Sequence, residues 1–281
     1  MPTVSDRSRL ISIVQSRQNA RVRELRAAFT RSGSGVTEVI GIEGEHLLAE
    51  AVRSGLRLRS VFVRAEPDHR SLSRLEHLDL PPSVPIVSLN PAVFASAVET
   101  ESPQGIAALV ETPHFSLGEV LAGPRPLILV AAALQDPGNF GTLVRSAEAF
   151  GATGIIALPG TVSIWNGKAL RASAGSAFRI PVVAERSAAA LAALAERRIP
   201  ILAAVPQASD PSAIPCTRAN LADAAAILIG NEGAGLSAEL LEHADARIFI
   251  PTPGPVESLN AAIAASVLLY EAARQRGSEK R

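Results

Sequence analysis

A long apolar segment toward the C-terminal end of the sequence constrains the fold more than any other feature. Its apolar residues fall at nearly every helical angle: Leu259, Ala261, Ala262, Ile263, Ala264, Ala265, Val267, Leu268 and Leu269. A helix that is apolar almost all round must be buried on more than one face. Ser258 and Asn260 stand at the entrance to this segment, and we therefore expect both side chains to be held rigidly.

Short apolar segments alternate with predicted helices from residue 127 onward. The predicted strands are 127–130, 155–158, 201–205, 226–229 and 248–250, and the predicted helices between them are 142–150, 188–198 and 237–244. This alternation is typical of a mostly parallel sheet covered on both faces. Parallel sheets bind ligands at the carboxyl ends of their strands. We therefore expect the loops after 127–133, 226–229 and 248–250 to meet at one edge.

The N-terminal part of the chain predicts a smaller α/β domain. It is built from a helix over residues 10–30, a strand at 39–42, a helix at 44–52 and strands at 61–63 and 86–88. Prolines and glycines then gather between residues 113 and 126. The expected organisation is a domain over 1–112, a linker over 113–126 and a second domain over 127–281.

Charge is unevenly distributed along a chain whose net charge is zero. Residues 1–74 contain 13 arginines and 8 acidic residues, whereas residues 75–281 contain 14 basic and 19 acidic ones. Seven of the arginines fall between Arg7 and Arg31, where Glu24 is the one acid. A basic surface supplies the phosphate contacts that bind nucleic acid without reading its sequence. The pattern fits RNA binding and an ordinary solvated helix face equally well.

Composition excludes several other classes of protein. The single cysteine, Cys216, rules out an internal disulfide and a cysteine-based metal cluster, and the five histidines lack ligand spacing. We therefore expect no metal. No apolar run reaches the ~20 residues needed to span a bilayer, and no apolar segment of a secretory signal follows Arg7 and Arg9. The expectation is a cytoplasmic protein without a membrane partner.

Three segments, at 136–147, 227–236 and 257–260, carry the polar residues that could do chemistry. The glycine-rich sequence 230–235 follows a predicted buried strand. It lacks the Gly-Lys-Ser/Thr of a P-loop and the G-x-G-x-x-G of a dinucleotide-binding fold. Glycines allow a backbone to approach a ligand closely. This loop therefore fits either an adenosine moiety held by main-chain groups or a plain tight turn.

Together and in this order, the three segments resemble the SpoU (TrmH-like) family of RNA ribose 2′-O-methyltransferases, within the SPOUT superfamily. The resemblance implies an α/β protein. Its N-terminal domain is expected to be similar to ribosomal protein L30e, and its C-terminal SPOUT domain to have a parallel sheet and a trefoil knot. The resemblance also implies S-adenosylmethionine as cofactor, a homodimer and an RNA substrate. The phrases 42–47 and 102–105 match the family's N-terminal module, whose position in the chain favours 23S ribosomal RNA.

The resemblance also assigns roles to individual residues. The expected catalytic residues are Asn139, Arg145, Glu232, Ser258 and Asn260, and the expected cofactor-binding residues are Gly230, Asn231, Gly233, Ile250 and Leu259. RNA contacts are expected from Arg17, Arg21, Arg23, Lys168 and Arg171. The family's matching arginine is held to be a base, but arginine is effectively always protonated. We therefore expect Arg145 to bind a phosphate and polarise the 2′-hydroxyl, with Glu232 as a competing proton acceptor.

Simpler interpretations stay open for several of these residues. Arg145 could form a structural ion pair, and Ser258 and Asn139 could cap helices. For the whole chain, the alternatives are a tRNA ribose 2′-O-methyltransferase and a non-catalytic RNA-binding homologue. A dinucleotide-dependent oxidoreductase would need a fingerprint that the sequence lacks.

Overall fold

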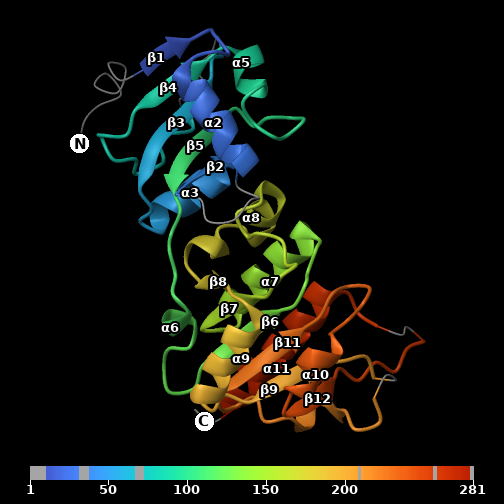
Figure 1. The fold of residues 1–281 in the computed structure, drawn as a ribbon. Coiled ribbons are helices and arrows are strands. Elements are labelled where there is room, and N and C mark those ends of the chain that lie inside the picture. The colour runs from blue at the N-terminus through green and yellow to red at the C-terminus, as the bar shows by residue number, and fades with distance from the viewer. Residues whose placement is uncertain (1–10, 32–37, 67–72, 208–209, 256–257, 279–281) are drawn as a thin grey trace. The chain divides into compact units, whose positions relative to one another are not determined.

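Two compact units make up the chain. The computed structural model describes residues 11–31, 38–66, 73–207, 210–255 and 258–278 (Figure 1). The first unit is Met1–Pro113 with Trp165–Phe178, and the second is His114–Ile164 with Arg179–Arg281. Residues 165–178 therefore pack with the N-terminal unit, although the sequence analysis included them in the C-terminal domain. Arg7, Arg9 and Glu257, which the sequence analysis singled out, lie outside the described residues.

A mixed five-stranded sheet forms the centre of the first unit (Figure 1). Its order is β1-β4-β3-β5-β2, in which β1, β4 and β3 are parallel and β5 is antiparallel to both β3 and β2. The strands are β1 (Ile11–Val14), β2 (Val39–Glu43), β3 (Leu58–Arg64), β4 (Ile86–Leu89) and β5 (Ile106–Glu111). The helices are α2 (Ala20–Arg31), α3 (Glu45–Arg53) and α5 (Pro91–Ala95).

The first strand corrects the helix expected over residues 10–30. Ile11–Val14 form an edge strand that pairs in parallel with Ile86–Leu89. The helix begins only at Ala20, where the side-chain oxygen of Asn19 accepts a hydrogen bond from the amide of Arg21 at 2.9 Å. Pairing with a strand distant in sequence thus outweighs the local helical pattern.

All seven strands of the second unit run parallel, as expected. Their order is β10-β12-β9-β11-β6-β7-β8. They are β6 (Leu127–Ala131), β7 (Gly154–Ala157), β8 (Val182–Ala184), β9 (Ile201–Ala204), β10 (Ile214–Pro215), β11 (Ala225–Ile229) and β12 (Ala246–Phe249). The sequence analysis missed the two shortest, β8 and β10, which lie at the edges of the sheet.

Helices cover both faces of this parallel sheet. On one face, α6 (Leu117–Val120), α9 (Ser187–Glu196) and α10 (Ala238–Glu242) share a core with the sheet. The helices α7 (Pro137–Ala149) and α11 (Ala261–Ser278) pack against each other and contact β7 and β11. Neither helix contributes residues to the core that α6, α9 and α10 share with the sheet. Successive side chains of a strand point to opposite faces of a sheet, so α7 and α11 lie on the other face.

The helix α7 begins earlier than the expected start at Thr142. The side chain of Asp136 caps it, accepting a hydrogen bond from the amide of Asn139 at 2.7 Å, and Pro137 occupies the first helical position. Proline suits that position because its missing N–H would have no partner there. Asn139 therefore lies inside the first turn, and the alternative in which it caps the helix is wrong.

The final helix, α11, is only partly buried. Its inner face consists of Ala261, Ala262, Ala265, Leu268, Leu269 and Ala272. On another face, Ile263, Val267 and Tyr270 remain 55%, 37% and 56% exposed. The expectation of burial on more than one face is therefore wrong for a single chain. Within the described ranges, no helix combines the length and hydropathy needed to cross a membrane.

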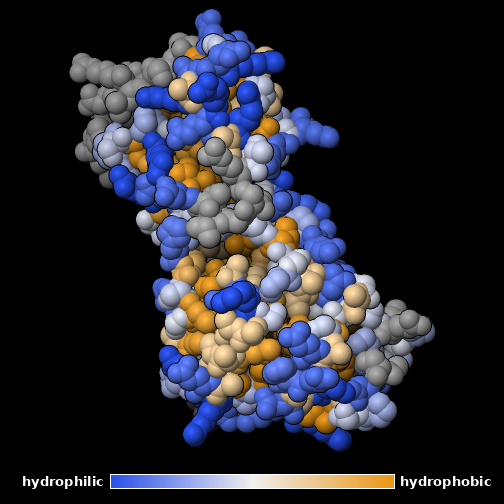
Figure 2. Space-filling view, viewed as in Figure 1, coloured by the Kyte–Doolittle hydropathy of each residue, from blue (hydrophilic) through white to orange (hydrophobic). Residues whose placement is uncertain are grey.

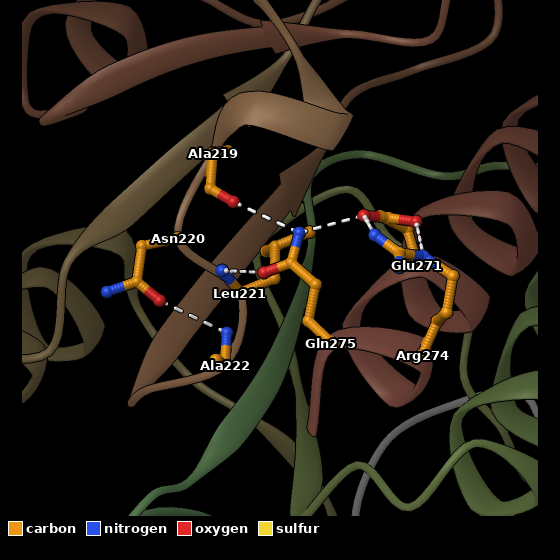
Figure 3. Close-up of polar contacts among 7 residues, drawn as sticks. All are labelled: Ala219, Asn220, Leu221, Ala222, Glu271, Arg274 and Gln275. Atoms are coloured by element: carbon orange, nitrogen blue, oxygen red, sulfur yellow. Dashed lines mark hydrogen bonds and ion pairs between the residues drawn. The ribbon is translucent and has the colours of Figure 1, made fainter. Parts of the chain in front are cut away.

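The C-terminal half of α11 is fastened to the segment that leads into β11 (Figure 3). The amide of Gln275 donates to the carbonyl of Ala219 at 3.1 Å and to Glu271 at 2.8 Å, and its oxygen accepts from the amide of Leu221 at 2.9 Å. Arg274 holds the same carboxylate of Glu271 with two hydrogen bonds of 2.7 Å. The bonds from Gln275 to Ala219 and Leu221 restrain α11 along its axis, and the bonds to Glu271 hold the Gln275 side chain in place.

Candidate active site

The loops that follow β6, β11 and β12 meet at the carboxyl edge of the parallel sheet, as the sequence predicts. The glycine-rich loop after β11 is closed by a pair of 3.0 Å backbone hydrogen bonds between Asn231 and Gly235. A Cβ on Gly230 would lie 2.5 Å from the carbonyl carbon of Gly235 and 2.7 Å from the amide of Leu236. Only glycine therefore fits at position 230 in this loop.

Asn231 organises the loop with its side chain. Its oxygen accepts hydrogen bonds of 2.9 Å from the amides of Gly233 and Ala234, and its amide nitrogen donates to the carbonyl of Ala133 at 2.8 Å. Ala133 has a φ of 55°, a left-handed conformation that is costly for a residue with a Cβ. Asn231 thus joins two of the loops and helps to hold a strained backbone at the edge of the site.

A directed chain of side-chain amides joins all three loops. The amides of Ala262 and Ile263 donate to the oxygen of Asn260 at 2.9 and 3.3 Å. Asn260 in turn donates to the oxygen of Asn139 at 3.0 Å, and Asn139 donates to Glu232 at 3.1 Å. The backbone amides fix the orientation of Asn260, and each amide then fixes the next. The chain ends by presenting an N–H donor to a carboxylate oxygen of Glu232.

The cap of α11 is Asn260, whose side chain accepts the two amide hydrogens described above. The alternative in which Ser258 caps this helix is therefore wrong. Ser258 is exposed, and none of the described residues forms a hydrogen bond with its side chain. The expectation of a rigidly held side chain thus holds for Asn260 and not for Ser258.

A cavity opens beside this chain of amides. The five expected cofactor-binding residues all line it: Gly230, Asn231, Gly233, Ile250 and Leu259. Glu232 and Ser258 line it too, whereas Asn139, Arg145 and Asn260 do not. The lining combines branched apolar side chains with main-chain groups of a loop whose Gly230 has no room for a Cβ. That combination suits an adenosyl group, which needs an apolar slot and close backbone contact.

Several lining residues were not foreseen from the sequence. They come from the loop after β9 (Val205, Pro206 and Gln207) and from Thr252, Ala261, Ala264 and Leu268. The oxygen of Gln207 accepts a hydrogen bond from the amide of Thr252 at 3.2 Å, which joins two walls of the cavity. The sequence does predict the strand 201–205, which leads into this loop. It does not predict that the strand lies between β11 and β12, because a local pattern does not encode strand order.

Arg145 lies on α7, one residue before Ser146, and is exposed. None of the described residues forms an ion pair or a hydrogen bond with its guanidinium. The alternative of a structural ion pair within the chain therefore has no support in the described residues. An exposed guanidinium of this kind is suited to binding a phosphate of a ligand.

All five residues expected to contact RNA belong to the first unit. Arg21 and Arg23 lie on α2 and Arg17 just before it, all three exposed; Figure 2 shows strongly hydrophilic side chains over this helix. Lys168 and Arg171 are exposed on α8 (Gly167–Ser173), which Asn166 caps.

Arg171 has an acidic neighbour, Glu99. Partial burial raises the pKa of Glu99 from its ordinary value of 4.5. The positive charge of Arg171 opposes this rise, and the negative charge of Glu43 adds to it. Glu99 thus offsets part of the positive charge of Arg171 in the free protein.

Comparison with known proteins identifies both parts of the sequence. Residues 126–270 match the SpoU rRNA Methylase family, and residues 19–108 match the MRM3-like substrate binding domain. The 23S rRNA (guanosine(2553)-2′-O)-methyltransferase RlmP of Bacillus subtilis is 34% identical, over 92% of this chain and 97% of its own length. The 23S rRNA (guanosine-2′-O-)-methyltransferase RlmB of Xanthomonas campestris is 29% identical, over 84% and 96%.

Solved structures agree with these matches. The SpoU methyltransferase AviRb from Streptomyces viridochromogenes, in complex with AdoMet, has a TM-score of 0.79 and 27% identity. The match covers 93% of this chain and 99% of that one. The parallel sheet, the cavity at its carboxyl edge and these matches lead to one conclusion: the chain belongs to the SpoU rRNA methylase family.

Proposed function

We propose that the protein transfers the methyl group of S-adenosylmethionine to a ribose 2′-hydroxyl of 23S ribosomal RNA. The observation that carries this proposal is the amide chain Asn260–Asn139–Glu232 beside a cavity bounded by Gly230. The relatives RlmP and RlmB, which are named for this reaction on 23S rRNA, support the choice of substrate.

Gly230, Asn231, Gly233, Ile250 and Leu259 would hold the adenosyl group. S-adenosylmethionine supplies an activated methyl on a sulfonium, so the protein has only to align the hydroxyl with it and exclude water. Alignment alone can lower the barrier by about 7–11 kcal/mol at best. The stiff amide chain and Ser258 at the cavity wall are suited to that task.

Arg145 would bind the phosphate next to the target ribose and polarise the hydroxyl. It cannot act as a base at neutral pH because arginine keeps its proton. Glu232 is the better proton acceptor: one of its oxygens accepts from Asn139, and none of the described residues donates to the other. A carboxylate held by one hydrogen bond keeps a free oxygen for the leaving proton.

The first unit would deliver the RNA. Its match to a substrate-binding domain and the exposed guanidinium groups of Arg17, Arg21 and Arg23 support this role. Contacts of this kind bind phosphates and position the RNA. Lys168 and Arg171 on α8 would add to the same surface, and a cytoplasmic location follows from such a substrate.

The protein would act as a homodimer. Ile263, Val267 and Tyr270 form an exposed apolar row on α11, and the ring of Tyr270 packs edge-on against Phe150 at 5.9 Å. Exposed apolar rows of this kind mark surfaces that a partner covers. Because Arg145 is exposed on the neighbouring helix α7, a second copy on this face would lie beside it.

The second unit would also contain the trefoil knot that its family implies. The strand β12 comes later in the chain than β9 and β10 but lies between them in the sheet. The chain therefore comes back through the space that the connection from β9 to β10 spans. Gln275 and Arg276 of α11 then bond to Ala219 and Leu221, in the segment that leads from β10 into β11. A crystal structure traced continuously from residue 201 to residue 278 would test this.

The function is tested by transfer of labelled methyl from S-adenosylmethionine to unmodified 23S rRNA, 16S rRNA and tRNA. We expect label in 23S rRNA alone, at a single dinucleotide that resists alkali because its 2′-oxygen is blocked. Label in tRNA alone would favour the tRNA alternative. Measurable cofactor binding without label in any RNA, including ribosome assembly intermediates, would favour the non-catalytic homologue.

A further inference from the structure

The position of Arg145 depends on the helix that carries it. Its guanidinium has no partner among the described residues, so nothing at the tip of the side chain fixes where it lies. The rotation of α7 and its displacement along α11 therefore determine where the base of this side chain lies. A displacement of one residue along a helix axis moves a side chain by about 1.5 Å.

Two hydrogen bonds tie α7 to the α11 segment. Asn260, which caps α11, donates to Asn139 at 3.0 Å, and the hydroxyl groups of Ser146 and Ser266 lie 2.7 Å apart. On each helix the two attachment points are about two turns apart. They occur in the same order along both helices, so the helices run parallel and are held at two points.

The direction of the serine bond is set by its surroundings. The hydroxyl of Ser266 donates its one proton to the carbonyl of Ala262 at 2.7 Å. Ser146 must therefore donate to Ser266. The two serines form a relay that ends on the backbone of α11, just after the residue that caps it.

The hydrogen bond between the serines adds a distance requirement to the packing of the two helices. The buried residues of α7 include Leu143, Val144 and Ala147, and those of α11 include Ala262 and Ala265. Packing of ridges into grooves favours particular registers, and small side chains reduce the energy differences between neighbouring registers. A hydrogen bond with a 2.7 Å optimum distinguishes these registers much more sharply.

We infer that Ser266 is a positioning residue that acts through Ser146 to set the register of α7, and with it the place of Arg145. The inference rests on the proposed role of Arg145 in methyl transfer. A misplacement of ~1 Å at a reacting centre can cost roughly 100-fold in rate. The loss of one hydroxyl should therefore reduce turnover by more than its modest effect on stability suggests.

The test compares Ser266→Ala, Ser146→Ala, the double variant and Ser266→Thr with the wild type, in methyl transfer to unmodified 23S rRNA. Thr153→Val is the matched control: it removes a half-buried hydroxyl of the second unit that bonds to Val120 and Leu127, at 2.8 and 3.1 Å. Melting temperature, cofactor Kd, RNA KM and kcat are measured for each variant.

We expect each serine-to-alanine variant to lose about 10- to 100-fold in kcat with an unchanged cofactor Kd. The double variant should lose no more than either single one, because both break the same bond. Ser266→Thr keeps a hydroxyl at this position, so its kcat should be close to that of the wild type. Thr153→Val should lower the melting temperature comparably and leave kcat within about twofold of wild type.

Arg145→Ala separates the possible failures. If it is inactive while both serine variants turn over like Thr153→Val, the positioning inference is wrong and the proposed function stands. If Arg145→Ala is as active as wild type, both the role of Arg145 and the inference fail. Absence of transfer by the wild-type protein would instead overturn the proposed function itself.

Discussion

Asn260 donates a hydrogen bond to the side-chain oxygen of Asn139 at 3.0 Å, although the two residues are far apart in sequence. Each lies where a loop gives way to a helix. Backbone amides of α11 fix the side chain of Asn260, which in turn fixes that of Asn139. This one contact brings the first and third polar segments of the sequence together. Asn139 then passes the constraint to Glu232, the acid of the second segment.

Replacing Asn139 by aspartate should make methyl transfer sensitive to pH. The new carboxylate could still accept from Asn260 but would repel Glu232, so we expect a loss of roughly 100-fold at pH 8. Lowering the pH protonates the new carboxyl at position 139, which can then donate to Glu232 as the amide of Asn139 does. The ratio of variant to wild-type kcat/KM should therefore rise as pH falls. Asn139→Ala, which has no proton to regain, should give a flat ratio, and identical profiles for the two variants would contradict the prediction.

Gly230→Ala should disrupt the cofactor cavity. Its Cβ would meet backbone atoms of Gly235 and Leu236 that cannot move aside, and we expect a loss of about 1–3 kcal/mol in unfolding free energy. S-adenosylmethionine binding, measured by calorimetry, should weaken strongly. Gly118→Ala on α6, away from the cavity, is the control, because its Cβ would meet only the side-chain oxygen of Ser116 at 3.7 Å. Equal cofactor affinity in the two variants would contradict this account of the loop.

Neutralising Arg17, Arg21 and Arg23 together should weaken RNA binding without changing the affinity for S-adenosylmethionine. The slope of log affinity against log salt should fall by about 0.7–0.9 for each lost phosphate contact. Filter binding of the triple glutamine variant over a range of salt concentrations measures this. Arg53→Gln, which removes an exposed arginine already paired with Glu50, should leave the slope unchanged. An unchanged slope in the triple variant would show that α2 does not contact the RNA.

Ile263→Asp should convert the proposed homodimer into a monomer. The substitution buries a charge in an apolar interface, a cost of several kcal/mol that a partner would have to overcome. Sedimentation equilibrium should show the change in mass, and methyl transfer should fall with it. Ala192→Asp, at an exposed position of α9, is the control and should leave the mass unchanged. A wild-type protein that sediments as a monomer would contradict the proposed assembly.

Glu271→Gln should destabilise the protein in a pH-dependent way. The guanidinium of Arg274 lowers the pKa of Glu271 from its ordinary value of 4.5; burial opposes this and Gln275 adds to it. A lowered pKa stabilises the fold above the unfolded value and loses that effect as pH falls through the folded value. Urea unfolding should show a difference of about 1–3 kcal/mol near pH 7 that shrinks below ~pH 4.5. Glu239→Gln on α10 is the exposed control, and a difference independent of pH would show that charge is not involved.

Periodicity was sufficient to predict the parallel sheet and the meeting of three loops at one edge. Those predictions depend on local patterns, because buried strands such as β6 and β11 are continuously apolar. Residues expected to bind the cofactor, such as Gly230 and Leu259, lie on those loops and do line one cavity. Only the family resemblance attached individual roles to them, and those roles remain to be tested.

Features that depend on contacts between distant segments were not predictable. Gln207 reaches the cavity because β9 lies between β11 and β12, and no local pattern encodes strand order. Residues 11–14 become a strand only because β4 is there to pair with them. The bond between Ser146 and Ser266 likewise depends on how α7 and α11 pack against each other. Each of these is decided by tertiary packing.

The position of α11 in the chain affects when the site can form during synthesis. The ribosome makes α11 after every other described element, yet Ala261, Ala264 and Leu268 form one wall of the cofactor cavity. A nascent chain that has not emerged beyond these residues already contains both segments of the first unit, while the cavity proposed for the methyl donor still lacks a wall. Translation therefore completes the residues of the proposed RNA contacts before those of the cavity.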